Sequence, residues 1–309
     1  MKQTVSVTYN DNMMNMRNFL IVVIAIFSSA LSYAQPNLLN AKIPEEIGLK
    51  SAAQLISDND KPLEYGYVDD RDVLMGKTVW EIIDLSERIN FPLYFPIDTA
   101  NIGSDRRSLY DVLTKAIRNG EITEVYTDSY FNTKKSYKDI QASLTRIDTT
   151  DAAKEQMNAG QKISPEYILK QDLTAQDVSQ YKIKGYWYFD KRQSELKYRL
   201  LGICPVTPDV YTMNSEEKDY IELFWVFFPA SRDVLHEYKA FNDKNSAMPI
   251  SFDQILNSRR FNAVIYQEEN VYGDRAIVSY MKDNAQNQLL EAERVKEKIR
   301  DFEEDMWNY

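Results

Sequence analysis

The chain has 309 residues and carries 47 acidic side chains against 37 basic ones, which gives a formal net charge of −10. This balance argues against binding to nucleic acid or to anionic lipid through bulk charge. Cys204 is the only cysteine, which excludes an intramolecular disulfide, so stability has to come from a hydrophobic core.

The first residues have the pattern of a cleavable signal peptide. Arg17 precedes an apolar run over residues 19–31, and Ser32-Tyr33-Ala34 has the small-x-small pattern of a cleavage site. The run of 13 residues is shorter than the roughly 18 to 20 that cross a bilayer. We therefore expect residues 1–34 to be removed. The mature chain then starts near Gln35 without a cysteine for lipid attachment.

Residues 35–64 have no sustained hydrophobic period and are predicted to form an extended arm. An α+β core is expected over residues 65–282. Its first element, residues 78–85, fits a strand or a short helix equally well. A helix is predicted over residues 108–117, ending at Asn119-Gly120.

A strand is predicted over residues 124–126. The insertion at about 132–163 has few large apolar residues, so we expect it to be mobile or to cover a surface. Ser164-Pro165 has the pattern of a helix start.

Three apolar segments follow at residues 183–189, 196–204 and 221–228, separated by polar stretches. This pattern predicts an antiparallel β-meander. The third segment is apolar almost throughout, as expected for a strand covered on both faces.

A weak internal similarity links residues 108–126 to residues 251–266. Each segment begins with serine and an apolar residue, continues with a pair of aliphatic residues, and leads to an apolar pair that ends in tyrosine. The similarity leaves open whether the core consists of two similar halves.

Residues 283–309 are predicted to form a long amphipathic helix. Its apolar residues form one stripe on a charged helix: Ala285, Leu289, Ala292, Val295, Ile299, Phe302 and Met306. The stripe can pack on the chain's own core or bind a partner. Trp307, close to the end of this helix, favours a partner.

The residues with catalytic chemistry are sparse. The nine glycines form no phosphate-binding loop, and one histidine, His236, with one cysteine cannot supply the usual four ligands of a zinc site. No catalytic, metal or cofactor site is predicted. A carboxylate-dependent cell-wall hydrolase stays open as an alternative, with Glu268-Glu269 as the first pair to test.

Five blocks rich in aromatic residues extend across the predicted core. They are ERINFPLYFP at 87–96, WYFDKR at 187–192, ELKYRLLGI at 195–203, LFWVFFP at 223–229 and YQEENVYGDR at 266–275. Together they resemble the GldN/PorN family of the Bacteroidetes gliding motility and type IX secretion apparatus. The resemblance spans about residue 71 to the C-terminal helix.

The resemblance implies a soluble, non-enzymatic periplasmic protein without a cofactor. It implies self-association in a ring with an outer-membrane lipoprotein, GldK or PorK, and contact with the periplasmic region of the motor protein GldM or PorM. It implies association with the outer membrane through that lipoprotein only. A peptidoglycan-binding module with aromatic residues stacked on sugars is a further alternative.

Aromatic residues at these positions suit an interface. The candidate interface residues are Trp187, Tyr188, Trp225, Phe302 and Trp307. For Trp187 and Trp225, packing in the core is an equally open alternative.

Overall fold

An antiparallel sheet organises the computed structural model, which describes residue 43 and residues 60–98, 107–149, 168–209, 219–241, 250–282 and 284–307. Apart from residues 43 and 60, all of these belong to one compact unit, Lys61–Tyr309. The predicted signal peptide and nearly all of the predicted arm before residue 60 lie outside the described residues.

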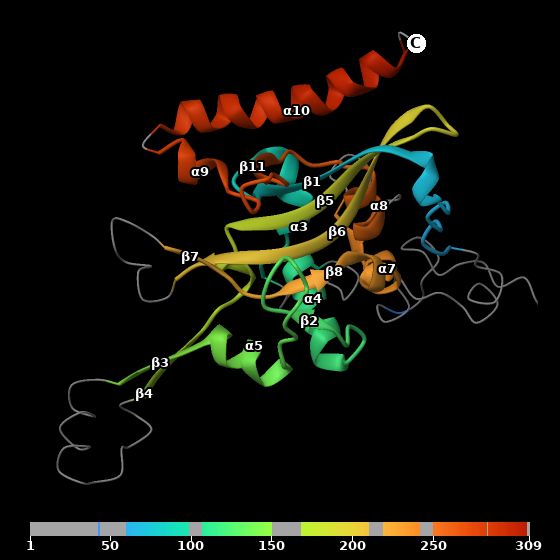
Figure 1. Cartoon of the computed structure of the whole chain (residues 1–309). Helices are drawn as coiled ribbons and strands as arrows, with labels where there is room; N and C mark the ends of the chain where they lie inside the picture. Colours follow the sequence, from blue (N-terminus) through green and yellow to red (C-terminus); the bar gives the residue numbers. More distant parts are fainter. Residues whose placement is uncertain are drawn as a thin grey trace, which may run out of the picture. The chain divides into compact units, whose positions relative to one another are not determined.

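The large sheet has the strand order β11-β1-β5-β6-β8-β2, and β7 pairs with β6 beside β8 (Figure 1). All neighbouring strands in it are antiparallel. Its strands are β1 (Val73–Asp84), β2 (Val125–Tyr126), β5 (Gln180–Asp190), β6 (Glu195–Pro208), β7 (Tyr220–Glu222), β8 (Trp225–Phe227) and β11 (Val264–Glu268).

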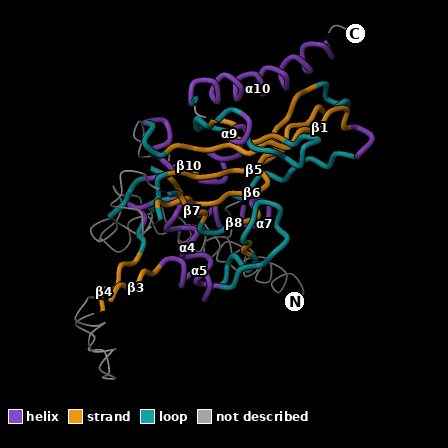
Figure 2. The backbone as a smooth tube through the Cα atoms, turned by 60° about the vertical axis from the view of Figure 1, so that its left-hand side comes forward, coloured by secondary structure: helices purple, strands orange, loops and turns teal. Residues whose placement is uncertain are grey.

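Two smaller sheets are separate from it: β3 (Thr145–Thr149) with β4 (Ile168–Asp172), and β9 (Lys239–Ala240) with β10 (Ile250–Ser251). The first of these is the two-stranded ribbon in Figure 2.

The helices and the strands confirm the predicted α+β class. The α-helices are α3 (Phe91–Tyr94), α4 (Leu109–Asn119), α5 (Tyr137–Leu144), α7 (Phe228–Glu237), α8 (Phe252–Asn257), α9 (Ile277–Tyr280) and α10 (Ala285–Trp307). Short 3₁₀ helices are η2 (Asp70–Asp72), η3 (Arg88–Asn90) and η5 (Ala175–Asp177).

Helix α4 forms where its local signals predict it. The Ser108 side chain accepts a hydrogen bond from the backbone N–H of Asp111 at the start of the helix. Gly120 ends it with a φ of 76°, a left-handed conformation that glycine adopts without a steric penalty.

The predicted antiparallel meander is confirmed: β5 pairs with β6, and β6 pairs with the segment after it. One detail differs. The third predicted strand is divided into β7 and β8, which pair with different parts of β6. Segment 78–85 belongs largely to strand β1, which lies between β5 and β11. Its neighbours in the sheet come from distant parts of the sequence.

The structure describes part of the segment between β2 and β5. The helix start expected at Ser164-Pro165 lies outside the described residues, and strand β4 begins at Ile168. The insertion contains helix α5 and strand β3 in its first part, and Ile140 of α5 is buried. Residues 150–167 lie outside the described residues.

The similar segments found in the sequence form similar local structures. Ser251 accepts a hydrogen bond from the backbone N–H of Gln254, as Ser108 does at the start of α4. Helix α8 then leads to β11 and α4 leads to β2, the two end strands of the sheet order. Both helices pack in the same hydrophobic cluster, so the two segments share one core.

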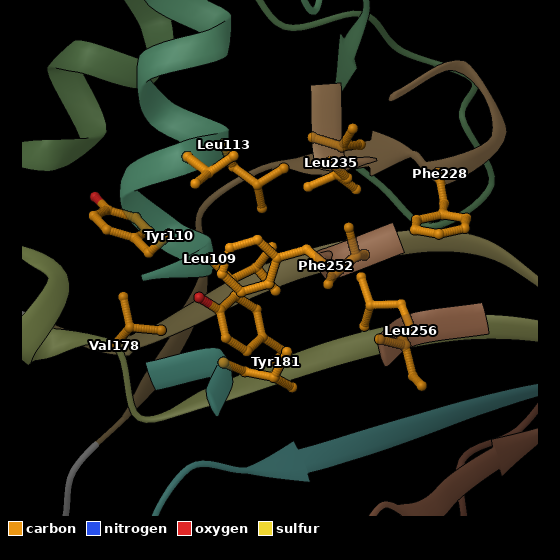
Figure 3. Packing of buried hydrophobic residues seen from close by; sticks show 14 of the residues in the cluster. Leu109, Tyr110, Leu113, Val178, Tyr181, Phe228, Leu235, Phe252 and Leu256 are labelled. Atoms are coloured by element: carbon orange, nitrogen blue, oxygen red, sulfur yellow. The ribbon is translucent and has the colours of Figure 1, made fainter. Parts of the chain in front are cut away.

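That largest cluster lies between the sheet and helices α4, α7 and α8. Figure 3 shows Leu109 of α4 and Phe252 of α8 over Tyr181 of β5. Leu235 of α7 and Leu200 of β6 belong to the same cluster, and all five residues are nearly inaccessible to solvent. Burial of side chains this large supplies the dominant driving force for folding.

An ion pair between the buried Glu81 and the half-buried Arg259 connects β1 to the chain after α8. The guanidinium of Arg259 donates two hydrogen bonds to the Glu81 carboxylate, at 2.8 and 2.9 Å. Tyr198 of β6 donates a third, at 3.2 Å. Arg259 has a left-handed backbone with a φ of 50°. Burial alone would lower the pKa of Arg259, but hydrogen bonding to Glu81 raises it.

A second cluster places α10 against the sheet. Ala292, Val295 and Ile299 of α10 pack with Val79 of β1 and Ile265 of β11. The middle of the predicted apolar stripe therefore packs on the chain's own core. In this part of the helix, the structure shows core packing and not a free surface for a partner.

Substitution of Glu81 by Gln should destabilise the protein by about 2 kcal/mol, because it leaves the half-buried Arg259 charge without its counter-ion. Urea unfolding followed by circular dichroism measures this loss. Glu293→Gln, which removes one partner of the exposed Glu293–Lys296 pair, is the matched control and should change stability by less than about 0.5 kcal/mol. Equal effects of the two variants would contradict the structural importance of the Glu81–Arg259 pair.

Substitution of Val295 by Asp should destabilise the protein by about 3 kcal/mol or more, since it forces a carboxylate into the apolar contact between α10 and β11. Leu290→Asp, at a position 63% exposed on the same helix, should change stability by less than about 0.5 kcal/mol. Thermal unfolding compares the two. An unchanged melting temperature for Val295→Asp would show that α10 does not pack on the sheet.

Candidate interface surfaces

Trp225, one of the five predicted interface residues, is a core residue. Its side chain is inaccessible to solvent and packs with Trp80, Tyr126 and Cys204. The indole N–H donates a 2.7 Å hydrogen bond to the Glu222 carboxylate. Packing in the core, the alternative given for Trp225, is therefore what the structure shows in this chain.

Tyr188 is also largely buried and lines the cavity described below, so an interface role for it stays a prediction. Its ring stacks on Tyr186 with centroids 6.1 Å apart. Trp187, on the opposite face of β5, is half-buried, and its ring lies 4.9 Å from the ring of Tyr198. It also lies 5.3 Å from the Arg259 guanidinium. Trp187 therefore shields the Glu81–Arg259 ion pair from solvent.

Phe302 and Trp307 lie in the last turns of α10. Phe302 is half-buried, and its ring contacts the ring of Phe189 in β5 with centroids 6.2 Å apart. The backbone of Trp307 ends the helix, but its side chain lies outside the described residues. An interface role for Phe302, Trp307 and Trp187 stays a prediction.

The sequence did not single out Tyr65, which anchors the segment Leu63–Val68, here called the strap. The Tyr65 ring lies between two guanidinium groups, 4.4 Å from that of Arg199 and 4.2 Å from that of Arg232. The Tyr65 hydroxyl donates a 2.8 Å hydrogen bond to Asn257. In the sequence, two tyrosines flank Gly66 directly after the predicted arm.

A cavity of about 550 Å³ lies between the strap and the β5–β6 hairpin. Polar residues of the hairpin and residues 64–68 line it; the hairpin contributes Tyr188, Asp190, Arg192, Gln193, Lys197, Tyr198 and Arg199. Asp190 is buried, and burial alone would raise the pKa of its carboxyl group. The pKa is nevertheless lowered, because the backbone N–H and guanidinium of Arg192 and the charge of Lys197 stabilise the carboxylate.

Large apolar side chains are exposed where α9 meets α10. Val278 of α9 is 60% exposed, and Leu289 and Leu290 of α10 are 53% and 63% exposed. The two helices are joined by a 2.8 Å hydrogen bond from the Gln288 side chain to the carbonyl of Met281. These three residues are here called the α9–α10 corner. Leu289 and Ala285 are the residues of the predicted apolar stripe that the chain leaves exposed.

Glu268 and Glu269 do not form a pair that faces a common cavity. Glu268 forms an ion pair with Lys77 at 3.1 Å, and Glu269 accepts a 3.2 Å hydrogen bond from the backbone N–H of Thr78. Both contacts hold β1 beside the end of β11. Neither glutamate lines the cavity under the strap.

His236 lies on α7 and Cys204 lies in β6. Burial raises the pKa of the Cys204 thiol well above its usual value, so the reactive thiolate is disfavoured. Within the described part of the chain, no group of three or more His, Cys, Asp or Glu side chains could hold a metal ion.

Among the described residues, no helix has the length and apolar character needed to cross a bilayer. No curated protein matches the chain. The family model for the gliding motility associated protein GldN matches residues 68–308. This match covers the large sheet, the helices that pack on it and the α9–α10 corner. The chain therefore belongs to the GldN family of gliding motility associated proteins.

Proposed function

We propose that this protein is a non-enzymatic structural component of the gliding motility and type IX secretion apparatus, and that it works by binding other proteins in the periplasm. Membership of the GldN family supports a role in gliding motility. The signal-peptide pattern of residues 1–34 supports export. In this proposal the protein forms a ring with the lipoprotein GldK or PorK, and the ring contacts the periplasmic region of GldM or PorM.

The observation that best supports a binding role is the exposure of the α9–α10 corner. Three large aliphatic side chains on two adjoining helices remain in contact with solvent, although the same helix α10 buries Ala292, Val295 and Ile299. We infer that these side chains form one apolar surface, and surfaces of this kind mark protein contact sites. Burial of such a surface on binding is favourable by roughly 1.5 to 3 kcal/mol for each large aliphatic side chain.

The rigidity of the corner suits it to this role. Tyr280 of α9 donates a hydrogen bond to the buried Glu291 of α10, at 3.2 Å. Gln288 of α10 bonds back to α9 at Met281. These contacts fix the two helices before a partner arrives, so little conformational entropy is lost on binding. We assign this corner to the lipoprotein contact.

The double variant Leu289→Asp, Leu290→Asp should reduce co-purification with the lipoprotein by about tenfold or more, because two apolar contacts are replaced by charges. The matched control is Gln286→Asp, Asn287→Asp, which adds the same charge at exposed positions of the same helix. Both variants should melt at the temperature of the unmodified protein. Full retention of the lipoprotein by the Leu289→Asp, Leu290→Asp variant would sink the assignment.

A further inference from the structure

The strap is held to the rest of the chain mainly by one side chain. Tyr65 lies between Arg199 of β6 and Arg232 of α7, and its hydroxyl bonds to Asn257 of α8. Cation–π contacts of this kind contribute roughly 0.5 to 2 kcal/mol each. The site that accepts Tyr65 thus combines three elements that belong to the body of the fold.

Side-chain donors complete the attachment. Arg192 donates to the carbonyl of Tyr67 at 2.7 Å, and Arg199 donates to the carbonyl of Gly66 at 3.4 Å. Among the described residues, the strap makes no backbone-to-backbone hydrogen bond. Withdrawal of the strap would therefore break no strand pairing and open no hydrophobic core.

Two large side chains of the strap remain exposed beside Tyr65. Leu63 is 85% exposed and Tyr67 is 79% exposed. The strap also crosses β6 at Arg199. In the described part of the chain, residues 195–200 of β6 pair with β5 alone, and pairing with β8 on the other side begins at Gly202. The strap and this strand edge together leave both apolar side chains and backbone groups available to a neighbouring molecule.

Charge makes the strap and its binding site complementary. Residues 61–72, which include the strap, contain four acidic and two basic side chains, a net charge of −2. The site presents Arg192 and Arg199, together with Arg232, which is also paired with Asp253 at 2.7 Å. This attraction acts equally on the strap of the same chain and on the strap of another copy.

The connection to β1 can act as a hinge. It consists of Asp69 and the short helix η2, and Asp70 and Arg71 are exposed. At Asp72 the chain is tied to the hairpin again, because Arg192 forms an ion pair with its carboxylate at 3.0 Å and Lys191 donates its backbone N–H to its carbonyl at 2.8 Å. A change of backbone direction at residues 69–71 would redirect the strap and leave β1 in place.

We propose that copies of this chain exchange straps, so that Tyr65 of one copy binds between Arg199 and Arg232 of the next. The Tyr65 site of each copy is thus filled by the strap of a second copy. That strap has the same sequence, so it can form the same contacts that the strap makes within one chain. Exchange of an identical segment costs little because the same contacts form again. Head-to-tail exchange closes a ring when the rotation between copies allows it. The inference rests on the proposed assembly function.

The test uses two full-length copies with different affinity tags, co-expressed with the lipoprotein partner. One copy carries a photo-reactive phenylalanine derivative in place of Tyr67, which is exposed and leaves the Tyr65 site intact. Irradiation of the purified complex should join the two tags covalently, with position 67 linked to residues 190–199 of the other copy. Adding Tyr65→Ala to the photo-reactive copy should abolish this link.

Links from position 67 to residues 190–199 of the same chain alone would overturn the exchange, as would the absence of any link to that hairpin. The photo-reactive group at Tyr272, which is exposed on the loop after β11, is the control and should give no link to residues 190–199. If the two tagged copies do not co-purify, the proposed assembly function itself fails. If they co-purify and link only within one chain, the assembly stands and the exchange does not.

Discussion

The ion pair between Glu81 and Arg259 is the interaction on which the arrangement of the sheet depends. It joins the strand β1 to a residue 178 positions later in the chain, and Tyr198 of β6 completes the hydrogen bonding. A buried charge pair is tolerated only with geometry that satisfies both partners. It therefore selects one placement of the loop before β11, and with it the position of the edge strand on which α10 packs.

Local signals in the sequence predicted local structure well. Ser108 and Gly120 define helix α4, and the polar turn after Phe189 separates β5 from β6. The place of β1 between β5 and β11 could not be predicted, because such pairing depends on side chains far apart in the sequence. The apolar stripe of the last helix was recognised, but its division into a buried middle and an exposed Leu289 depends on where the sheet ends.

The candidate site illustrates the same limit. Trp225 and Tyr188 were selected for their aromatic character, yet both are buried, since a strand pattern does not tell which face a neighbouring layer covers. The α9–α10 corner, which we propose as a contact surface, is instead formed by aliphatic side chains. Tyr65 was missed because its partners, Arg199, Arg232 and Asn257, are more than 130 residues away. The resemblance to the GldN/PorN family, carried by aromatic blocks, was confirmed over residues 68–308.

These features support one physical account: a folded body held by the Glu81–Arg259 ion pair, an apolar corner for a partner, and a weakly attached strap that can pass between copies. The most direct test of the central claim is the mass of the native complex that contains this protein, measured by size-exclusion chromatography with light scattering on gently solubilised cell envelopes. The account predicts a complex many times the mass of one chain, with the lipoprotein present in it. Elution at the mass of a single chain, free of other proteins, would contradict it.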